Sequence, residues 1–455
     1  MKVIIAGAGA IGVALARYLR AENDEIVLID KDADALGNLS EQLDIQTIQG
    51  CASYPSVLER AGAAHADVFL AVTGNDESNI VSCSVAGSVF HIPKRIARIS
   101  STEYSAVKYQ SFLQALSIDV VLSPEVETAT HIINNLSVAG SVDMTDMGDG
   151  LVQFVGLKCR KPSTLIGKTW AGIKDMIGPF NVCIVALKRR DHLVPLADMT
   201  VKAGDEIYFL TDRAHVSAVL DIFGYATLPA RYIMIYGGGK VGFQLAKQLE
   251  ETPGTHDITV VENQEDRARF LAENLDTTLV INGDALDDNL MDELNLKNYK
   301  IAIATTHSDE NNILLSMVSK RTGIERVCAL IHNPLYTNLL SGLGIDTTVD
   351  PNAVMVSSIL QYLRKGRVKD DYFIQSGIGE VLEIEALKTA KITKTNLGKV
   401  KVSAGVVIAG ILRGDLFMLP NKDLIVQEKD RVFLFVERGH VQDAEKLFSV
   451  GISFF

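Results

Sequence analysis

Short apolar runs alternate with amphipathic stretches along the first 100 residues. Each run ends at Gly, Asp, Thr or Ser, and each is short enough for a buried strand. Residues 12–19, between the first two runs, carry apolar positions at helical spacing. A strand–helix rhythm of this kind predicts a parallel sheet covered by helices on both faces. The predicted strands are 2–7, 25–30, 47–50, 66–73 and 95–100.

The same order returns in the second half of the chain. Gly7, Gly9 and Gly12 are repeated as Gly237, Gly239 and Gly242. Further matches are Thr73, Asp76, Glu77 and Asn79 with Thr306, Asp309, Glu310 and Asn312. The second set of predicted strands is 232–237, 258–262, 277–283, 300–306 and 326–331. The chain therefore contains an internal duplication, which defines its fold.

An apolar helix and a small β-rich module complete each repeat. Ser123-Pro124 and Asp350-Pro351 are N-terminal caps for the two helices, which we expect to pack on a neighbouring protomer. Short strands are predicted at 151–157, 182–189 and 206–212 before a helix at 215–223. They are echoed at 381–387, 406–413 and 431–437 before a helix at 440–448.

The predicted fold class is α/β, with two Rossmann-like doubly wound parallel-sheet domains, each followed by a small α+β subdomain. The predicted boundaries are 1–123 (first Rossmann domain), 124–142 (crossover helix and linker), 143–228 (first small subdomain), 231–349 (second Rossmann domain), 350–371 (crossover helix and linker) and 372–455 (second small subdomain).

Composition narrows the classes of function. The 455 residues include 44 basic and 56 acidic side chains, a net charge of −12, so a basic nucleic-acid surface is not expected. No apolar run approaches the ~18 residues of a membrane span. The five cysteines show no CxxC spacing, which predicts neither a metal site nor a disulfide framework. We therefore expect a cytoplasmic protein.

A glycine-rich turn between the first strand and the first helix is the main candidate site. It comprises Gly7, Ala8, Gly9, Ala10, Ile11 and Gly12. In such a turn the first glycine permits the bend, the second lets a pyrophosphate approach the backbone, and the third lets helix and strand pack closely. Asp30 ends the second strand, where a carboxylate accepts hydrogen bonds from ribose hydroxyls and repels a 2′-phosphate. These features favour NAD(H) over NADP(H).

The second repeat meets the same conditions. Its turn comprises Gly237, Gly238, Gly239, Lys240, Val241 and Gly242, and Glu262 ends its second strand. Lys240 stands where the first repeat has Ala10, and a cation there can pair with a phosphate. The second site is therefore expected to suit a different nucleotide.

Other strand ends should face the same crevice, because parallel strands end at one edge of the sheet. In the first repeat these are Cys51, Ala52, Thr73, Gly74, Asn75 and Arg98. In the second they are Asp284, Ala285, Thr306, His307 and His332. Thr73 and Thr306 are candidate ligand contacts, with helix capping as the alternative. Arg98 suits a phosphate or a carboxylate, and the second repeat has Ala329 or Leu330 in its place.

These motifs together resemble a known family. A strand–GxGxxG–helix unit, an acid after the second strand, Ala71-Val72-Thr73 before Asp76-Glu77, and a β-rich module, all duplicated, are similar to the regulatory proteins of Trk potassium-uptake systems, which are tandem RCK (KTN) units. One departure is that the family's Gly-Asp-Ala is present at 283–285 but is Gly-Cys-Ala at 50–52.

The resemblance implies a peripheral protein on the inner face of the membrane, bound to a potassium-translocating subunit. It implies NAD(H), with ATP or ADP as further ligands, and a homo-oligomer, a dimer or tetramer, that forms a ring of RCK units. It implies regulation rather than catalysis.

An NAD-dependent oxidoreductase is the alternative function. Such an enzyme needs a proton donor near the nicotinamide. The histidines of the small modules, His192, His215 and His440, have no partnered constellation in the sequence. A purely structural scaffold would leave both phosphate turns unexplained. The sequence therefore favours a nucleotide-sensing regulator with no catalytic residues.

Overall fold

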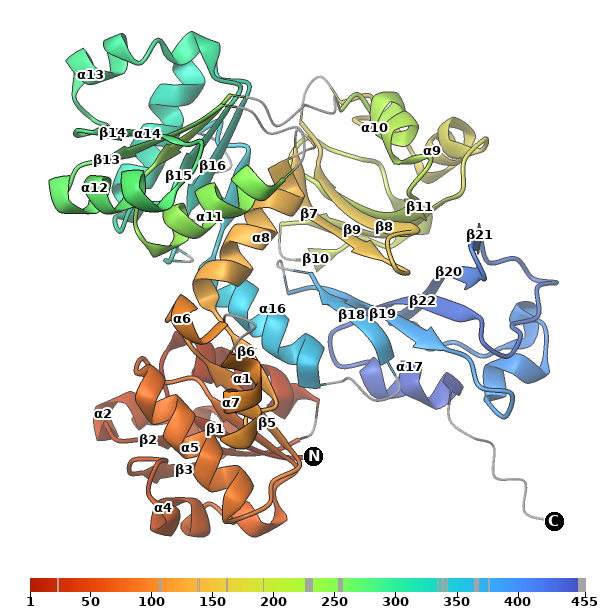
Figure 1. Ribbon diagram of the computed structural model, residues 1–455. Helices are drawn as coiled ribbons and strands as arrows, with labels where there is room; N and C mark the ends of the chain where they lie inside the picture. The colour runs from red at the N-terminus through yellow and green to blue at the C-terminus, as the bar shows by residue number, and fades with distance from the viewer. Residues whose placement is uncertain are drawn as a thin grey trace. The chain divides into compact units, whose positions relative to one another are not determined.

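The computed structural model is shown in Figure 1. It describes residues 1–22, 24–105, 109–136, 138, 140–160, 163–190, 192–225, 232–252, 257–333, 335–336, 340, 343–363, 368–374 and 377–448. The chain divides into two compact units, which are considered separately. Unit 1 is Met1–Glu127 with Asn352–Lys365, and unit 2 is Thr128–Pro351 with Gly366–Phe455.

Unit 1 is built on a six-stranded parallel sheet, the first Rossmann domain. Its strands are β1 (Lys2–Ala6), β2 (Glu25–Asp30), β3 (Gln46–Gln49), β4 (Val68–Ala71), β5 (Lys94–Arg98) and β6 (Val120–Leu122), in the order β3-β2-β1-β4-β5-β6. Its helices are α1 (Ala10–Ala21), α2 (Ala33–Leu36), α3 (Leu39–Leu43), α4 (Pro55–Arg60), α5 (Asp76–Ser88), α6 (Thr102–Ser105) and α7 (Gln110–Ala115). The strand order reverses between β1 and β4, and a crevice for ligands opens at that point.

Unit 2 contains the second Rossmann domain, with the same topology. Its strands are β12 (Ile233–Tyr236), β13 (Ile258–Glu262), β14 (Leu279–Asn282), β15 (Ile301–Ala304), β16 (Arg326–Leu330) and β17 (Thr347–Val349), in the order β14-β13-β12-β15-β16-β17. Its helices include α11 (Lys240–Glu251), α12 (Glu265–Asn274), α13 (Asp288–Glu293) and α14 (Asp309–Arg321). The ten predicted strands of the two sheets are confirmed, and each sheet gains a sixth edge strand, β6 or β17.

Unit 2 also contains both small subdomains, each with a five-stranded antiparallel sheet. The first has β7 (Ser141–Met147), β8 (Val152–Lys158), β9 (Val182–Arg189), β10 (His192–Leu193) and β11 (Glu206–Asp212), with α9 (Trp170–Ile177) and α10 (Val216–Phe223). The second has β18 (Val368–Phe373), β19 (Gly379–Glu385), β20 (Val406–Arg413), β21 (Leu416–Met418) and β22 (Arg431–Glu437), with α17 (Val441–Phe448). Their orders, β10-β9-β11-β8-β7 and β18-β19-β22-β20-β21, are equivalent.

The outer strands of the small sheets were not predicted. β7 begins at Ser141 and β18 at Val368, so both start inside the predicted linkers 124–142 and 350–371. The predicted boundary at 228–231 lies outside the described residues, as does the end of the chain beyond 448.

The two small sheets share one hydrophobic core. Phe154 and Tyr208 of the first sheet pack in the same buried cluster as Val381 and Phe433 of the second. The buried carboxylate of Asp143 (1% exposed) accepts a 2.8 Å hydrogen bond from the Tyr372 hydroxyl across the same contact. The small modules of the two repeats are therefore paired within one chain.

Two crossover helices follow the Rossmann sheets. They are α8 (Pro124–Leu136) and α16 (Pro351–Leu363). The Val126 N–H lies 3.5 Å from the Ser123 hydroxyl, in line with the predicted cap.

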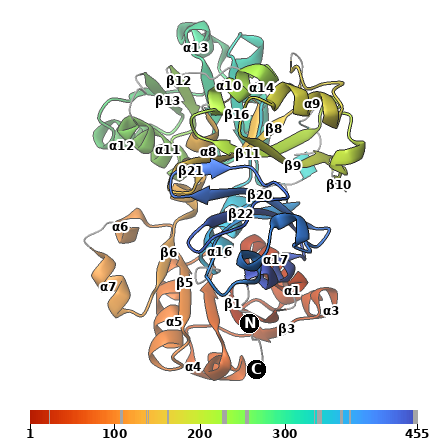
Figure 2. The same cartoon turned by 90° about the vertical axis from the view of Figure 1, so that its right-hand side faces the viewer.

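Each helix contacts the Rossmann domain of the other repeat. In unit 2 the Thr130 hydroxyl of α8 donates to Gln248 of α11, 3.0 Å away. In unit 1 the Lys94 ammonium of β5 donates to the Leu363 carbonyl of α16, 2.9 Å away, and Figures 1 and 2 show α16 beside the first sheet. Within the same chain, Ala129 and Leu136 of α8 and Ile359 and Leu360 of α16 are buried. Packing of these helices on a neighbouring protomer stays a prediction.

Candidate functional site

A cavity of about 640 Å³ lies at the carboxyl edge of the first sheet. It is bounded by the ends of β1, β2, β4 and β5. Its lining includes every residue predicted for the first site except Gly12, namely Gly7, Ala8, Gly9, Ala10, Ile11, Asp30, Cys51, Ala52, Thr73, Gly74, Asn75 and Arg98. Strand ends and the loops that follow them thus surround the cavity, and its volume is typical of a small-molecule binding site.

The three glycines of the turn have separate structural roles. Gly7 has a φ of +114°, in the region that favours glycine. A Cβ on Gly12 would lie 1.8 Å from the Gly7 carbonyl oxygen, so only glycine lets α1 approach β1 this closely. Around Gly9 no atom lies within 4 Å of the position of a Cβ. This open space beside the backbone is what the approach of a pyrophosphate requires.

Asp30 is fixed at the end of β2. Its Oδ2 accepts the Ala8 N–H at 2.6 Å, and its Oδ1 accepts the Asp32 N–H at 2.9 Å. Helix α1 begins at Ala10 with Gly9 as its N-cap, which supplies no side-chain hydrogen bond. The turn therefore presents an uncapped helix N-terminus beside an oriented carboxylate, a combination suited to a phosphate and a ribose.

Thr73 is held by a residue that the site prediction left out. The Oδ1 of Asn79 accepts the Thr73 N–H at 3.0 Å and its hydroxyl at 2.6 Å. The Asn79 amide nitrogen donates to the Thr73 and Arg98 carbonyls, and the side chain is fully buried. Both Thr73 donors are thus used inside the fold, while Asn75 is the N-cap of α5. The signal was present in the sequence, because Asn79 recurs as Asn312.

Arg98 is one of two cationic side chains that line the first cavity, with Lys31. Its Nη1 donates to the Thr73 carbonyl at 2.9 Å, and its Nε is buried without a protein partner among the described residues. In the second repeat Asn312 donates to the Leu330 carbonyl in the same way, which identifies Leu330 as the counterpart of Arg98. The two sites therefore differ by a positive charge at this strand end.

The second phosphate turn is built like the first. Gly237 has a φ of +97°, and a Cβ on Gly242 would lie 2.0 Å from the Gly237 carbonyl oxygen. Glu262 accepts the Gly238 N–H at 2.7 Å and the Gln264 N–H at 2.9 Å. Glu262 thus takes the structural place of Asp30.

Other predicted residues of the second site occupy neighbouring positions. Lys240 and Val241 begin α11, and a Cβ on Gly239 would lie 3.8 Å from the His307 ring. Asp284 accepts the Leu286 N–H at 2.9 Å, whereas Ala285 is buried in the core. Thr306 is bonded to Asn312 as Thr73 is to Asn79, and His332 pairs with Asp309 at 3.0 Å.

Helix α12 covers the second turn, which the sequence did not predict. The Arg267 guanidinium donates to the Gly238 and Gly239 carbonyls at 2.7 and 3.2 Å, and lies over the rings of Phe243 and Phe270. Burial lowers the pKa of Arg267, partly opposed by Glu262. A cation held on the turn itself gives the second site an electrostatic environment unlike that of the first.

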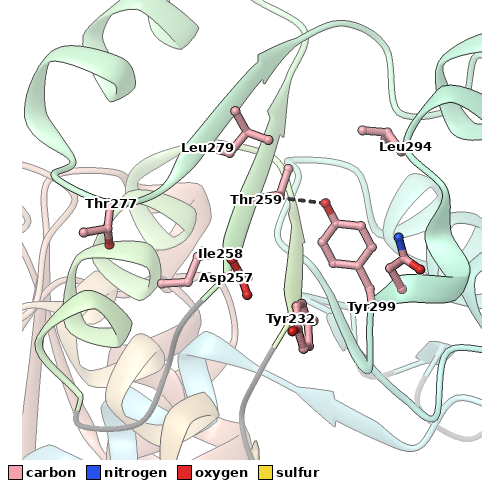
Figure 3. Close-up of a pocket in the computed structure, with 9 residues that line it drawn as sticks. Tyr232, Asp257, Ile258, Thr259, Thr277, Leu279, Leu294 and Tyr299 are labelled. Atoms are coloured by element: carbon pink, nitrogen blue, oxygen red, sulfur yellow. Dashed lines mark hydrogen bonds between the residues drawn. The ribbon is translucent and has the colours of Figure 1, made fainter.

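A second cavity, of about 500 Å³, lies at the opposite edge of the second sheet (Figure 3). It is lined by residues at the amino ends of β12 to β14, among them Tyr232, Asp257 and Thr259. The Tyr299 and Thr259 hydroxyls are hydrogen-bonded across it at 2.8 Å. None of the predicted site residues lines this cavity.

Comparison with known proteins agrees with the sequence motifs. The TrkA-N domain matches residues 3–124 and 233–351, and the TrkA-C domain matches residues 381–449. The Trk system potassium uptake protein TrkA of Azorhizobium caulinodans is 34% identical, over 100% of both chains. The TrkA protein of Halomonas elongata is also 34% identical, over 100% of both chains. This chain belongs to the TrkA family.

Solved structures agree on the fold. The GsuK channel superposes with a TM-score of 0.62 at 19% identity, covering 98% of this chain and 78% of that one. The GsuK channel bound to NAD gives a TM-score of 0.60 at 20% identity with the same coverage. The predicted resemblance and the duplicated fold are thus confirmed. No described helix of this TrkA-family chain is long and apolar enough to cross a membrane.

Proposed function

We propose that this chain is the nucleotide-binding regulatory subunit of a Trk-type potassium uptake system. The observation that carries the proposal is the first cavity, where an uncapped helix N-terminus, an open glycine and an oriented Asp30 carboxylate face one space. NAD(H) is the proposed ligand, because its pyrophosphate suits the turn and its ribose hydroxyls suit the carboxylate. The NAD-bound GsuK channel, which shares the fold, supports this choice.

ATP and ADP are proposed as further ligands. Backbone N–H groups recognise phosphates whatever the rest of the nucleotide is, so the turns admit a di- or triphosphate. The second site, with Lys240 and Arg267 at its turn, suits a ligand with more phosphate charge. Different nucleotides in the two sites would give the chain two inputs.

We propose regulation rather than catalysis, a choice that the surroundings of the cavity support. The histidines considered for proton transfer, His192, His215 and His440, lie in the small subdomains, and none lines the first cavity. A ligand that binds one conformation better than another shifts the population toward it. We propose that this shift is passed to a membrane potassium-translocating subunit, with the chain on the inner face of the membrane in a ring of RCK units.

Replacement of Asp30 by alanine tests the nucleotide site. It removes a charged acceptor and frees the Ala8 N–H, so the Kd for NADH should rise about tenfold or more. Isothermal calorimetry on D30A, E262A and the double variant separates the two sites. Unchanged affinity in the double variant would rule out the ribose role of both acids.

A pull-down from solubilised membranes tests the partner. The tagged full chain should recover a potassium transporter, and NADH or ATP should change the amount recovered. If no transporter is recovered without nucleotide, with NADH or with ATP, the proposed assembly is contradicted.

A further inference from the structure

One residue of the first cavity comes from the far end of the sequence. Asn352, the second residue of α16, lines the cavity together with Gly9, Asp30 and Arg98. Helix α16 follows the second Rossmann domain in the sequence, yet residues Asn352–Lys365 belong to unit 1. The wall of the first cavity is therefore completed by the crossover helix of the second repeat.

Helix α16 is held firmly against the first repeat. The Ser358 hydroxyl donates to Glu127 at 2.7 Å, and Lys94 donates to the Leu363 carbonyl at 2.9 Å. The apolar side chains of Met355 and Ile359 are fully buried. These anchors lie within the three helical turns after Asn352 and fix the position of its backbone.

The chemistry of this position suits a nucleotide. An asparagine amide donates through nitrogen and accepts through oxygen, so it can serve a phosphate oxygen or a ribose hydroxyl. It stands in the first turn of a 13-residue helix, where the partial positive charge favours an anion.

We propose that a nucleotide bound in the first cavity is contacted by Asn352, so that α16 of the second repeat senses the occupancy of the first site. The inference rests on the proposed nucleotide-binding function. It adds a ligand contact from outside the GxGxxG domain and gives the first site a direct link to the second repeat.

The first repeat does not offer the same group. Ser123-Pro124-Glu125 corresponds in sequence to Asp350-Pro351-Asn352, so a carboxylate replaces the amide. Glu125 is 9% exposed and accepts a hydrogen bond from the Ser123 hydroxyl. The amide of Asn352 therefore has no counterpart in Glu125.

The consequence for regulation follows from the path of the chain. Helix α16 is joined at its start to β17 and leads on to β18 of the second small subdomain. A ligand that binds one conformation of the chain better than another biases the equilibrium between them. Occupancy of the first site is thereby coupled to the second repeat.

Calorimetry with NADH on the full-length chain tests the contact. Loss of one hydrogen bond in N352A should raise the Kd about three- to tenfold, and the added charge in N352D should raise it further. The control is Q361A, in the same helix but outside the cavity lining, which should bind like the wild type. Wild-type affinity in both N352A and N352D would overturn the inference.

Hydrogen exchange tests the sensing. In the wild type, saturating NADH should slow exchange in both α1 and α16. In N352A saturated with NADH, α1 should still be protected, whereas α16 should not. Equal protection of α16 in both proteins would overturn the inference and leave the proposed function intact. A wild-type chain that binds none of NADH, ATP and ADP would instead refute the proposed function itself.

Discussion

Gly12→Ala is expected to destabilise the first Rossmann domain strongly, whereas Gly9→Ala should leave it folded and abolish most nucleotide binding. The added Cβ at Gly12 would lie 1.8 Å from the Gly7 carbonyl oxygen. That atom belongs to the backbone of the turn, so it cannot rotate away as a side chain would. The cost should reach about 3 kcal/mol, the upper end for overpacking.

Gly9 presents the opposite case. Its φ of −73° is accessible to alanine, and no atom lies within 4 Å of the added Cβ. Stability should change by less than about 1 kcal/mol, in either direction. The methyl group would instead occupy the space in which a phosphate approaches the turn, so the Kd for NADH should rise at least about tenfold, or 1.4 kcal/mol.

The measurement must resolve the two units. Trp170 is the only tryptophan and lies in unit 2, so its fluorescence does not report on the first domain. Hydrogen exchange of β1 and β4 measures stability, and calorimetry measures binding. Gly242→Ala provides the matched variant in the second repeat, since its Cβ would lie 2.0 Å from the Gly237 carbonyl. A G12A protein with wild-type protection of β1 would refute the packing argument.

The sequence predicted those parts of the fold that depend on local pattern. The central strands and the turns were predictable, because burial on both faces produces continuous apolar runs and the tight approach at Gly12 permits only glycine. The short edge strand β6, with three residues between Asp119 and Ser123, lacks such a run. β7 contains two aspartates and alternates less clearly, so it was not predicted as a strand, and its first two residues fell in the predicted linker.

The site was predictable only where its residues adjoin the turn or a strand end. Asn352 and Arg267 lie on helices, and their positions depend on how those helices pack rather than on a local motif. Each crossover helix contacts the Rossmann domain of the other repeat. The spacing of apolar residues shows that such a helix has an apolar face, but not which part of the chain packs on it. Long-range placement of this kind explains why the prediction named the turn and strand-end residues of the first cavity but not Asn352.

The second large effect is expected at Arg326, a buried cation in unit 2. Arg326 is 1% exposed at the start of β16, and burial lowers its pKa to about 10. Its guanidinium donates to the Leu136 carbonyl at the end of α8 and to the Ser141 hydroxyl at the start of β7, 2.8 Å away. It thus ties the first small subdomain to the second Rossmann sheet.

Arg326→Ala should destabilise unit 2 by about 3 kcal/mol or more, because it leaves a cavity and removes the donors of a buried carbonyl and hydroxyl. Urea unfolding followed by Trp170 fluorescence should show a lower midpoint. Arg321→Ala, at an exposed position of α14, is the control and should stay within about 0.5 kcal/mol of the wild type. An unchanged urea midpoint in R326A would show that the guanidinium does not stabilise the contact between the small subdomain and the second Rossmann sheet.

Arg326→Met separates packing from hydrogen bonding. Methionine keeps much of the apolar stem of arginine but supplies no donor. If the buried stem dominates, R326M should recover most of the lost stability, as happens when buried charges are replaced by apolar side chains. We expect only partial recovery, since Leu136 and Ser141 would still lack their donor, and NADH affinity at the Asp30 site in unit 1 should stay unchanged. Full recovery in R326M would show that the two hydrogen bonds do not hold the subdomain in place.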